Sequence, residues 1–284
     1  MSFTRKLDSR IIKDLKNEAL YMKMGNDIDK FKVFPAIRDN RVDFYHKGGQ
    51  LFKYRHGEFS THIKYAAVIP KDKNDYISES SPLTIDVNFV RDYKRIKENC
   101  SKYSGVEDLG VSKLYHKFPY TNNKANTIIL DIEVSFESVT KSKKSDRIDI
   151  LFYNKDERVL RFVEAKHFSN AELWADVGSV PKIKSQITRY EKQIKTMKSK
   201  ILSAYCEYIK KINSLFKLAL PLPIDVDPNV PLLVFGFDRN QQKGRFEDLV
   251  LKSAALKGMC YYAIGNVGGT KPDNFWNGIK QFKG

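Results

Sequence analysis

Three apolar segments follow one another at short intervals in the middle of the chain, and they constrain the fold more than any other feature of the sequence. Residues 127–136, 147–153 and 159–166 are rich in Ile, Leu, Val and Phe. Runs of this length and composition are typical of β-strands. The charged stretch 141–146 and the tight turn 154–157 are short links, so we expect an antiparallel meander.

A long amphipathic helix is predicted after Pro181. Ten apolar residues repeat at intervals of three and four, which places them on one face of a helix. These residues are Ile183, Ile187, Tyr190, Ile194, Met197, Ile201, Tyr205, Tyr208, Ile212 and Leu215. The Pro-rich stretch 221–231 is expected to end the helix, and the apolar run 232–237 is typical of a strand buried on both faces. The sequence therefore predicts a mixed α/β fold with a central mixed sheet flanked by helices.

The first 85 residues are predicted to form a small α+β region of their own. Apolar residues at helical spacing predict helix within 1–35. Two aromatic-rich runs, 41–46 and 50–54, flank a Gly-Gly pair, which is typical of a β-hairpin. Residues 59–69 are expected to form a further strand.

A domain boundary is predicted close to residue 85. Residues 70–84 contain many Lys, Asp, Ser and Pro residues, a composition typical of a linker. Two helices are predicted after it, within 87–116. We therefore expect an accessory region at 1–85 and a core domain at 86–284.

The charge balance favours an anionic partner. The chain of 284 residues has 50 Lys and Arg against 34 Asp and Glu, a formal net charge of +16. Nucleic acid is the first candidate and an anionic membrane surface the second. Residues 181–217 contain ten Lys and Arg against two Glu, so this helix is expected to contact phosphates.

Several classes of protein are not expected. No apolar run approaches the roughly 18 residues of a membrane span, and the first residues lack the apolar segment of a signal peptide. Three cysteines match neither a disulfide framework nor a zinc motif. A cytoplasmic location without membrane association is therefore the expectation.

Charged residues interrupt two of the apolar strands. Glu164 and Lys166 are two apart, so they share one face of a strand, and Asp149 lies near Glu164 if the two strands pair. Neighbouring carboxylates repel unless a cation lies between them, and oxygen ligands favour Mg²⁺ or Mn²⁺. We expect Asp149 and Glu164 to bind this metal, while Lys166 orients or deprotonates a water molecule. Together they are a minimal set for phosphodiester hydrolysis.

This constellation resembles the PD-(D/E)XK nuclease superfamily over roughly residues 87–265. Asp149 matches the first acid, and Glu164 and Lys166 match the E-x-K, whereas Ile148 stands where the family often has Pro. The resemblance implies a restriction-endonuclease-like core.

The helix after the E-x-K strand extends the resemblance. Gln186 and Tyr190 are similar to the Q-x-x-x-Y element of RecB-like and lambda-exonuclease-like members, which implies that both lie near the active site and the nucleic acid. Four residues apart, they share one face of the helix. Lys184 and Arg189 are the basic residues that we expect to contact the substrate with them.

Many members of this superfamily have a further acid upstream. Glu133 is the best candidate for a catalytic role, with Asp131 and Glu137 as alternatives that the sequence does not separate.

Aromatic and basic residues are interleaved in the predicted hairpin and the strand after it. The aromatic residues are Phe44, Tyr45, Phe52, Tyr54, Phe59 and Tyr65. The basic residues and histidines are His46, Lys47, Lys53, Arg55, His56, His62 and Lys64. Such a pattern fits base stacking, but the ordinary alternation of a strand with one buried face explains it as well. The second interpretation is slightly preferred.

The function predicted from the sequence is that of a metal-dependent nuclease acting on nucleic acid, with DNA as the expected substrate. Phage defence, restriction and DNA processing are the expected settings. The alternative is a non-catalytic nucleic-acid-binding module on a nuclease-like fold. A third interpretation is a basic interaction protein that binds an acidic partner or an anionic membrane. The sequence leaves open whether the chain forms a homo-oligomer or binds a protein partner.

Overall fold

The computed structural model describes residues 3–69, 74–81, 86–122, 124–136, 147–176 and 179–283, which form two compact units. The core unit consists of Met1–Phe3, Asn122–Cys206 and Leu220–Gly284. The N-terminal unit consists of Thr4–Thr121 and Glu207–Ala219. The protein is mixed α/β, as the sequence predicts, and no helix of the described residues is long and apolar enough to cross a membrane.

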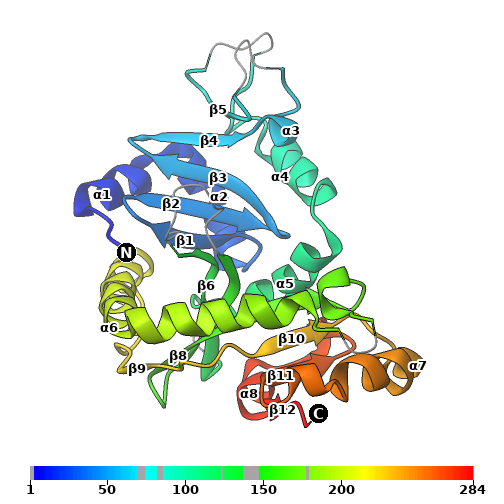
Figure 1. The fold of residues 1–284 in the computed structure, drawn as a ribbon. Helices are drawn as coiled ribbons and strands as arrows, with labels where there is room; N and C mark the ends of the chain where they lie inside the picture. Colours follow the sequence, from blue (N-terminus) through cyan, green and yellow to red (C-terminus); the bar gives the residue numbers. More distant parts are fainter. Residues whose placement is uncertain are drawn as a thin grey trace. The chain divides into compact units, whose positions relative to one another are not determined.

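The core unit is built on a seven-stranded mixed sheet in the order β12-β11-β10-β8-β7-β6, with β9 beside β8 (Figure 1). Its strands are β6 (Thr127–Ser135), β7 (Arg147–Asn154), β8 (Val159–His167), β9 (Asp225–Val226), β10 (Leu232–Phe235), β11 (Cys260–Ile264) and β12 (Lys280–Gln281). Strands β6, β7 and β8 are antiparallel, whereas β10 runs parallel to both β8 and β11. The predicted meander and the predicted mixed sheet are therefore confirmed. The predicted charged stretch 141–146 lies outside the described residues.

Strand β8 changes its pairing halfway along its length. Its first half pairs with β7, and the last pair of that ladder joins Ile150 to Val163. From Glu164 onward the ladder lies on the opposite edge, where Glu164 is paired with Leu232 of β10. The β7-facing edge of β8 is therefore left without a strand partner from Glu164 onward, within the described residues.

The helices of the core unit are dominated by α6 (Lys182–Phe216), whose residues up to 206 belong to this unit. The shorter elements are η1 (Ala171–Leu173), α7 (Arg239–Gln241), the π-helical η2 (Gln242–Leu251), η3 (Ala254–Leu256), η4 (Val267–Gly269) and α8 (Pro272–Asn277). All ten residues of the predicted apolar stripe of α6 are buried. The long helix is therefore confirmed, and its amphipathic pattern follows from packing.

The N-terminal unit contains a five-stranded antiparallel sheet in the order β1-β2-β3-β4-β5. Its strands are β1 (Phe34–Arg38), β2 (Arg41–His46), β3 (Gly49–Arg55), β4 (Glu58–His62) and β5 (Tyr76–Ser78). Its helices are α1 (Ser9–Asn17), α2 (Ala19–Asp29), α3 (Ile63–Ala66), α4 (Tyr93–Lys102) and α5 (Val106–Lys117). The predicted hairpin is confirmed as β2 and β3, and Gly48 has the positive φ (+88°) that its turn requires.

Two predictions within this unit are wrong. The strand expected over 59–69 ends at His62, because the His62 ring accepts a hydrogen bond of 3.1 Å from the Lys64 N–H and caps helix α3. Residues 74–81 of the expected linker contain β5, which pairs with β4 as the edge strand of the sheet.

The division into units also differs from the predicted boundary at residue 85. Helices α4 and α5 belong to the N-terminal unit rather than to the core, and the division falls between Thr121 and Asn122. The Asn99 side chain donates a 2.9 Å hydrogen bond to the Tyr65 carbonyl, and the Tyr115 hydroxyl accepts one of 2.7 Å from the Gly48 N–H. These contacts fix α4 and α5 to the N-terminal sheet and its α3 extension.

Candidate active site

Three carboxylates lie on adjacent strands of the core unit. Glu133 of β6 and Asp149 of β7 lie between two paired positions of the β6–β7 ladder, and Asp149 and Glu164 directly follow the last pair of the β7–β8 ladder. The three acids therefore lie on neighbouring strands, and the charges of Glu164 and Glu133 both act on Asp149.

Asp149 lies where β8 separates from β7. Its Oδ2 atom accepts a 2.8 Å hydrogen bond from the Ala165 N–H, which has lost a strand partner at this point. Burial and the negative charge of Glu164 raise the pKa of Asp149 well above its ordinary value, and Glu133 adds to this effect. The Ala165 N–H and Lys166 act in the opposite direction. A cation bound beside Asp149 and Glu164 would relieve this repulsion.

Glu164 is 1% exposed and receives two polar contacts at one atom. Its Oε1 accepts a 2.7 Å hydrogen bond from Gln186 Nε2 and lies 2.8 Å from Lys166 Nζ. The orientation of this carboxylate is therefore fixed both from helix α6 and from its own strand.

Lys166 is buried between two carboxylates. Its Nζ lies 2.8 Å from Glu164 and 3.1 Å from Oε2 of Glu172 in η1. The Asn170 side chain accepts a 2.9 Å hydrogen bond from the Glu172 N–H and so caps this short helix. Glu172 was not predicted from the sequence, because it lies in an irregular segment and belongs to no motif.

Gln186 and Tyr190 connect α6 to the start of β7. Gln186 Nε2 donates a 2.8 Å hydrogen bond to the Tyr190 hydroxyl, which donates one of 2.7 Å to the Arg147 carbonyl. Tyr190 is buried, so these contacts lie within the protein. The predicted contact of both residues with a substrate stays a prediction.

The alternatives for the upstream acid have different surroundings in the structure. Asp131 is fully buried and accepts hydrogen bonds from the Tyr205 hydroxyl (2.9 Å) and the Ile132 N–H (2.8 Å). Its contacts are those of a structural residue in the sheet–helix interface. Glu137 lies outside the described residues.

Glu133 has a backbone conformation that is rare for a residue with a side chain. Its φ of +52° lies in the left-handed region, which interrupts the alternation of an extended strand and costs about 1–3 kcal/mol. Its carboxylate pairs with the Arg147 guanidinium at 2.6 Å. Strain of this kind gathers at functional sites, which favours Glu133 over Asp131 as the third acid.

Lys184 and Arg189 lie on the first turns of α6 but take no part in the contacts described above. Arg189 is exposed and Lys184 is half-buried. Their predicted role in contacting nucleic acid stays a prediction.

The donor set fits a hard divalent cation. Within the described residues, no group of three or more His, Cys, Asp and Glu side chains is arranged to hold a metal ion. Asp149 and Glu164 still offer the one or two carboxylates with which Mg²⁺ is commonly bound, the remaining ligands being water and substrate phosphate. Oxygen ligands favour Mg²⁺ or Mn²⁺ over zinc.

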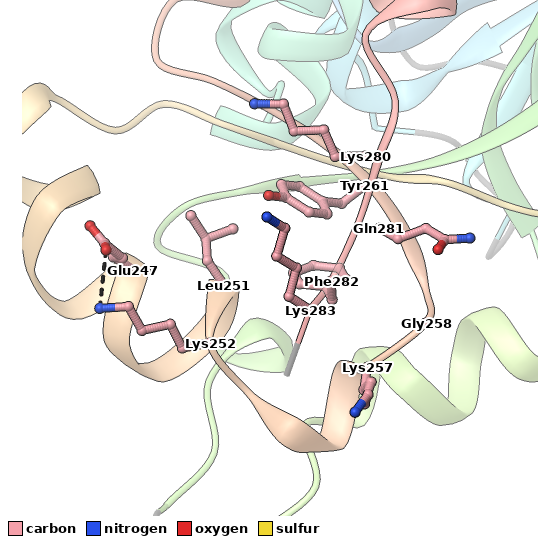
Figure 2. A pocket seen from close by; sticks show the side chains of 10 residues that line it. All are labelled: Glu247, Leu251, Lys252, Lys257, Gly258, Tyr261, Lys280, Gln281, Phe282 and Lys283. Carbon is pink, nitrogen blue, oxygen red and sulfur yellow. Dashed lines mark ion pairs between the residues drawn. The ribbon is translucent and has the colours of Figure 1, made fainter.

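A cavity of about 810 Å³ lies elsewhere in the core unit, and Figure 2 shows the side chains that line it. Lys252, Lys257, Lys280 and Lys283 contribute to its walls, and Lys252 pairs with Glu247 at 3.0 Å. None of the predicted site residues lines this cavity.

Comparisons with known proteins found no match: no family model, no curated protein and no solved structure is similar to the chain. The assignment of a function therefore depends on the site itself. The structure joins Asp149, Glu164, Lys166, Gln186 and Tyr190 into one connected cluster, with Glu133 on the strand beside Asp149.

Proposed function

We propose that the protein is a metal-dependent nuclease with a restriction-endonuclease-like core of the PD-(D/E)XK type. The observation that carries this proposal is the buried Lys166 ammonium held 2.8 Å from Glu164, with Asp149 on the neighbouring strand, at the point where two strands separate. Charged groups in apolar strands are destabilising unless they are paired or bind a cation, so this arrangement is expected at a site with a chemical role.

Each residue of the cluster has a distinct part in phosphodiester hydrolysis. Asp149 and Glu164 would hold Mg²⁺ or Mn²⁺, which when bound supplies Lewis-acid stabilisation of phosphate charge. Lys166 Nζ orients the attacking water or neutralises the charge that develops on the phosphate. Gln186 keeps the Glu164 carboxylate in place.

Nucleic acid is the substrate class that the charge of the chain favours, and DNA is the expected substrate. The exposed basic residues of α6, including Arg189, provide a surface that can follow a phosphate backbone. Roles in phage defence, restriction or DNA processing follow only by analogy with this fold type.

Cleavage assays with the purified protein test the proposal. Linear and circular double-stranded DNA, single-stranded DNA and RNA are incubated with Mg²⁺, Mn²⁺ or EDTA. We expect metal-dependent cleavage that falls by at least about 100-fold in Lys166→Ala, the scale on which a positioned catalytic group acts. Lys124→Ala removes an exposed lysine of the same unit and should leave the rate unchanged.

Two outcomes would overturn the proposal. Equal cleavage by the wild type and Lys166→Ala would assign the activity to a contaminant. Salt-sensitive binding without cleavage under any metal would instead favour the alternative, a nuclease-like fold that only binds nucleic acid.

A further inference from the structure

Four aromatic rings follow one another over the surface of the N-terminal unit. The ring of His62 lies 5.3 Å from that of Tyr76 and 5.5 Å from that of Tyr65, between ring centroids. Tyr65 in turn lies 6.3 Å from Tyr103. We call these four residues the aromatic stripe.

Four elements build the aromatic stripe: β4, α3, β5 and α4. Tyr76 of the edge strand β5 is paired with His62 at the end of β4, and α3 begins directly after His62 and carries Tyr65. Tyr103 ends helix α4, which the Asn99 side chain attaches to the Tyr65 carbonyl. Figure 1 shows α3 and α4 adjoining the β4 end of this sheet. The rings are therefore held by regular structure rather than by a loose loop.

The two ends of the aromatic stripe are exposed, and each has a lysine ammonium group over its ring. Tyr76 is 41% exposed and Tyr103 is 59% exposed. Lys53 Nζ lies 4.4 Å from the ring centroid of Tyr76, and Lys64 Nζ lies 5.8 Å from that of Tyr103. Each end of the stripe therefore combines an exposed aromatic ring with an ammonium group.

We propose that the aromatic stripe binds single-stranded nucleic acid. Unpaired bases displace the flexible Lys53 and Lys64 side chains from the ring faces of Tyr76 and Tyr103 and stack there, and the displaced ammonium groups contact the neighbouring phosphates. Aromatic platforms flanked by cations are the usual design of sites for single strands, because every base has a face that can stack. Bases within a duplex are already stacked on each other, so a duplex cannot use the rings in this way.

Two acids lie near the stripe: the exposed Asp75, which precedes Tyr76, and Asp43, which is 1% exposed. Asp43 on the neighbouring strand β2 is neutralised by Arg41 at 2.8 Å and lies 3.7 Å from Arg38. The lysine-lined cavity of the core unit is a weaker candidate for the same ligand. Figure 2 shows the ammonium groups of Lys257, Lys280 and Lys283 at separate places around that cavity rather than converging on one point.

This site is independent of the proposed cleavage activity, because binding by the N-terminal unit needs neither the metal nor Lys166. Binding of a fluorescein-labelled oligothymidylate is therefore measured by anisotropy in EDTA, so that no cleavage occurs. Tyr76→Ala and Tyr103→Ala are each expected to raise Kd by about 5- to 100-fold, the range for losing one stacked base. Tyr76→Phe and Tyr103→Phe keep the rings and should bind like the wild type.

The lysines and the strandedness of the ligand provide the second half of the test. Lys53→Ala and Lys64→Ala should each reduce the salt dependence of log Kd by about 0.7, whereas the exposed Lys113→Ala should not. The Kd for a duplex of the same length should be the same in the wild type and in all the tyrosine variants. Folding of each variant is verified by its thermal unfolding curve.

Unchanged binding in both tyrosine-to-alanine variants would overturn the proposal, as would equal losses in the alanine and phenylalanine variants. Failure of the nuclease proposal would appear separately, as an unaltered cleavage rate in Lys166→Ala.

Discussion

The amide of Gln186 in α6 donates a 2.7 Å hydrogen bond to the Glu164 Oε1 atom, the same atom that lies 2.8 Å from Lys166. The amide nitrogen also donates to the Tyr190 hydroxyl at 2.8 Å. Because an amide nitrogen has two N–H groups, both donors are used and the Gln186 side chain is held in one orientation. Glu164 is fixed in turn, which is the arrangement that a preorganised catalytic carboxylate needs.

Gln186→Met is therefore expected to reduce the cleavage rate by about 10- to 100-fold, the usual effect of losing a group that orients a metal ligand. Methionine keeps the volume but has no donor, so Glu164 loses its fixed orientation. The loss should appear in kcat rather than in KM, because the contact is with Glu164. Steady-state kinetics with Mg²⁺ measures both constants.

Tyr190→Phe is the matched variant for this network. It keeps the buried ring but removes the hydrogen bond to the Arg147 carbonyl, so we expect a smaller loss of rate and about 1 kcal/mol less stability. If Gln186→Met raised KM and left kcat unchanged, direct contact with the substrate would replace positioning as its role.

Glu133 and Asp131 should respond differently to removal of their charge. Glu133→Gln is expected to lower the cleavage rate by at least about 10-fold with little change in stability, because its charge acts on Asp149 and its carboxylate pairs with a surface arginine. Asp131→Asn should lower the free energy of unfolding by about 1–3 kcal/mol, because a buried acceptor of the Tyr205 hydroxyl is disturbed. Urea unfolding and initial cleavage rates measure the two effects. The reverse pattern would make Asp131 the functional acid.

Metal binding should be visible in stability as well as in cleavage. Mg²⁺ or Mn²⁺ at 100 times its Kd is expected to stabilise the wild type by about 2.7 kcal/mol. Asp149→Asn should abolish this increase, because one of the two proposed ligands is lost. In EDTA the same variant should be more stable than the wild type at pH 7, since the raised pKa of Asp149 means that its ionised form opposes folding. Thermal unfolding with and without metal gives both comparisons, and an equal metal effect in Asp149→Asn would place the ion elsewhere.

The main parts of the core unit could be predicted because their signals are local and periodic. The ladder of β7 and β8 follows from two apolar runs and a four-residue turn, and this pairing is what brings Asp149 close to Glu164. The buried stripe of α6 follows from its regular spacing, which also puts Gln186 and Tyr190 on one side. Site residues whose positions follow from such local patterns could therefore be predicted from the sequence.

The parts that could not be predicted depend on contacts between distant segments. Glu172 reaches Lys166 from a short helix without periodicity, so no pattern indicated it. Asp131 and Glu133 look alike in the sequence, and they differ only in the structure, where Asp131 is fully buried against Tyr205 and Glu133 has a left-handed backbone. The sequence composition did not indicate that α4 and α5 group with the N-terminal sheet, because the contacts that attach them, such as Asn99 to Tyr65, join segments distant in sequence.

His116 should make the stability of the N-terminal unit depend on pH. Its ring lies 5.8 Å from that of His46, and burial, with a smaller contribution from the charge of His46, lowers the pKa of His116 to about 3. In the unfolded chain its pKa is about 6.5. Below pH 6.5 the unfolded state therefore binds a proton that the folded state does not bind. Stability is lost as the pH falls from about 6.5 toward 3, by about 2 kcal/mol at pH 5.

His116→Leu removes this titratable group, so the stability of the variant should depend less on pH than that of the wild type. Urea unfolding is measured at pH 7 and pH 5 for the wild type, for His116→Leu and for His56→Asn, which replaces an exposed histidine in the β3–β4 turn. We expect the wild type and His56→Asn to lose stability in parallel, and His116→Leu to lose about 2 kcal/mol less between the two pH values. Equal losses in all three proteins would mean that the His116 ring is protonated in the folded state as readily as in the unfolded chain, which would contradict the prediction.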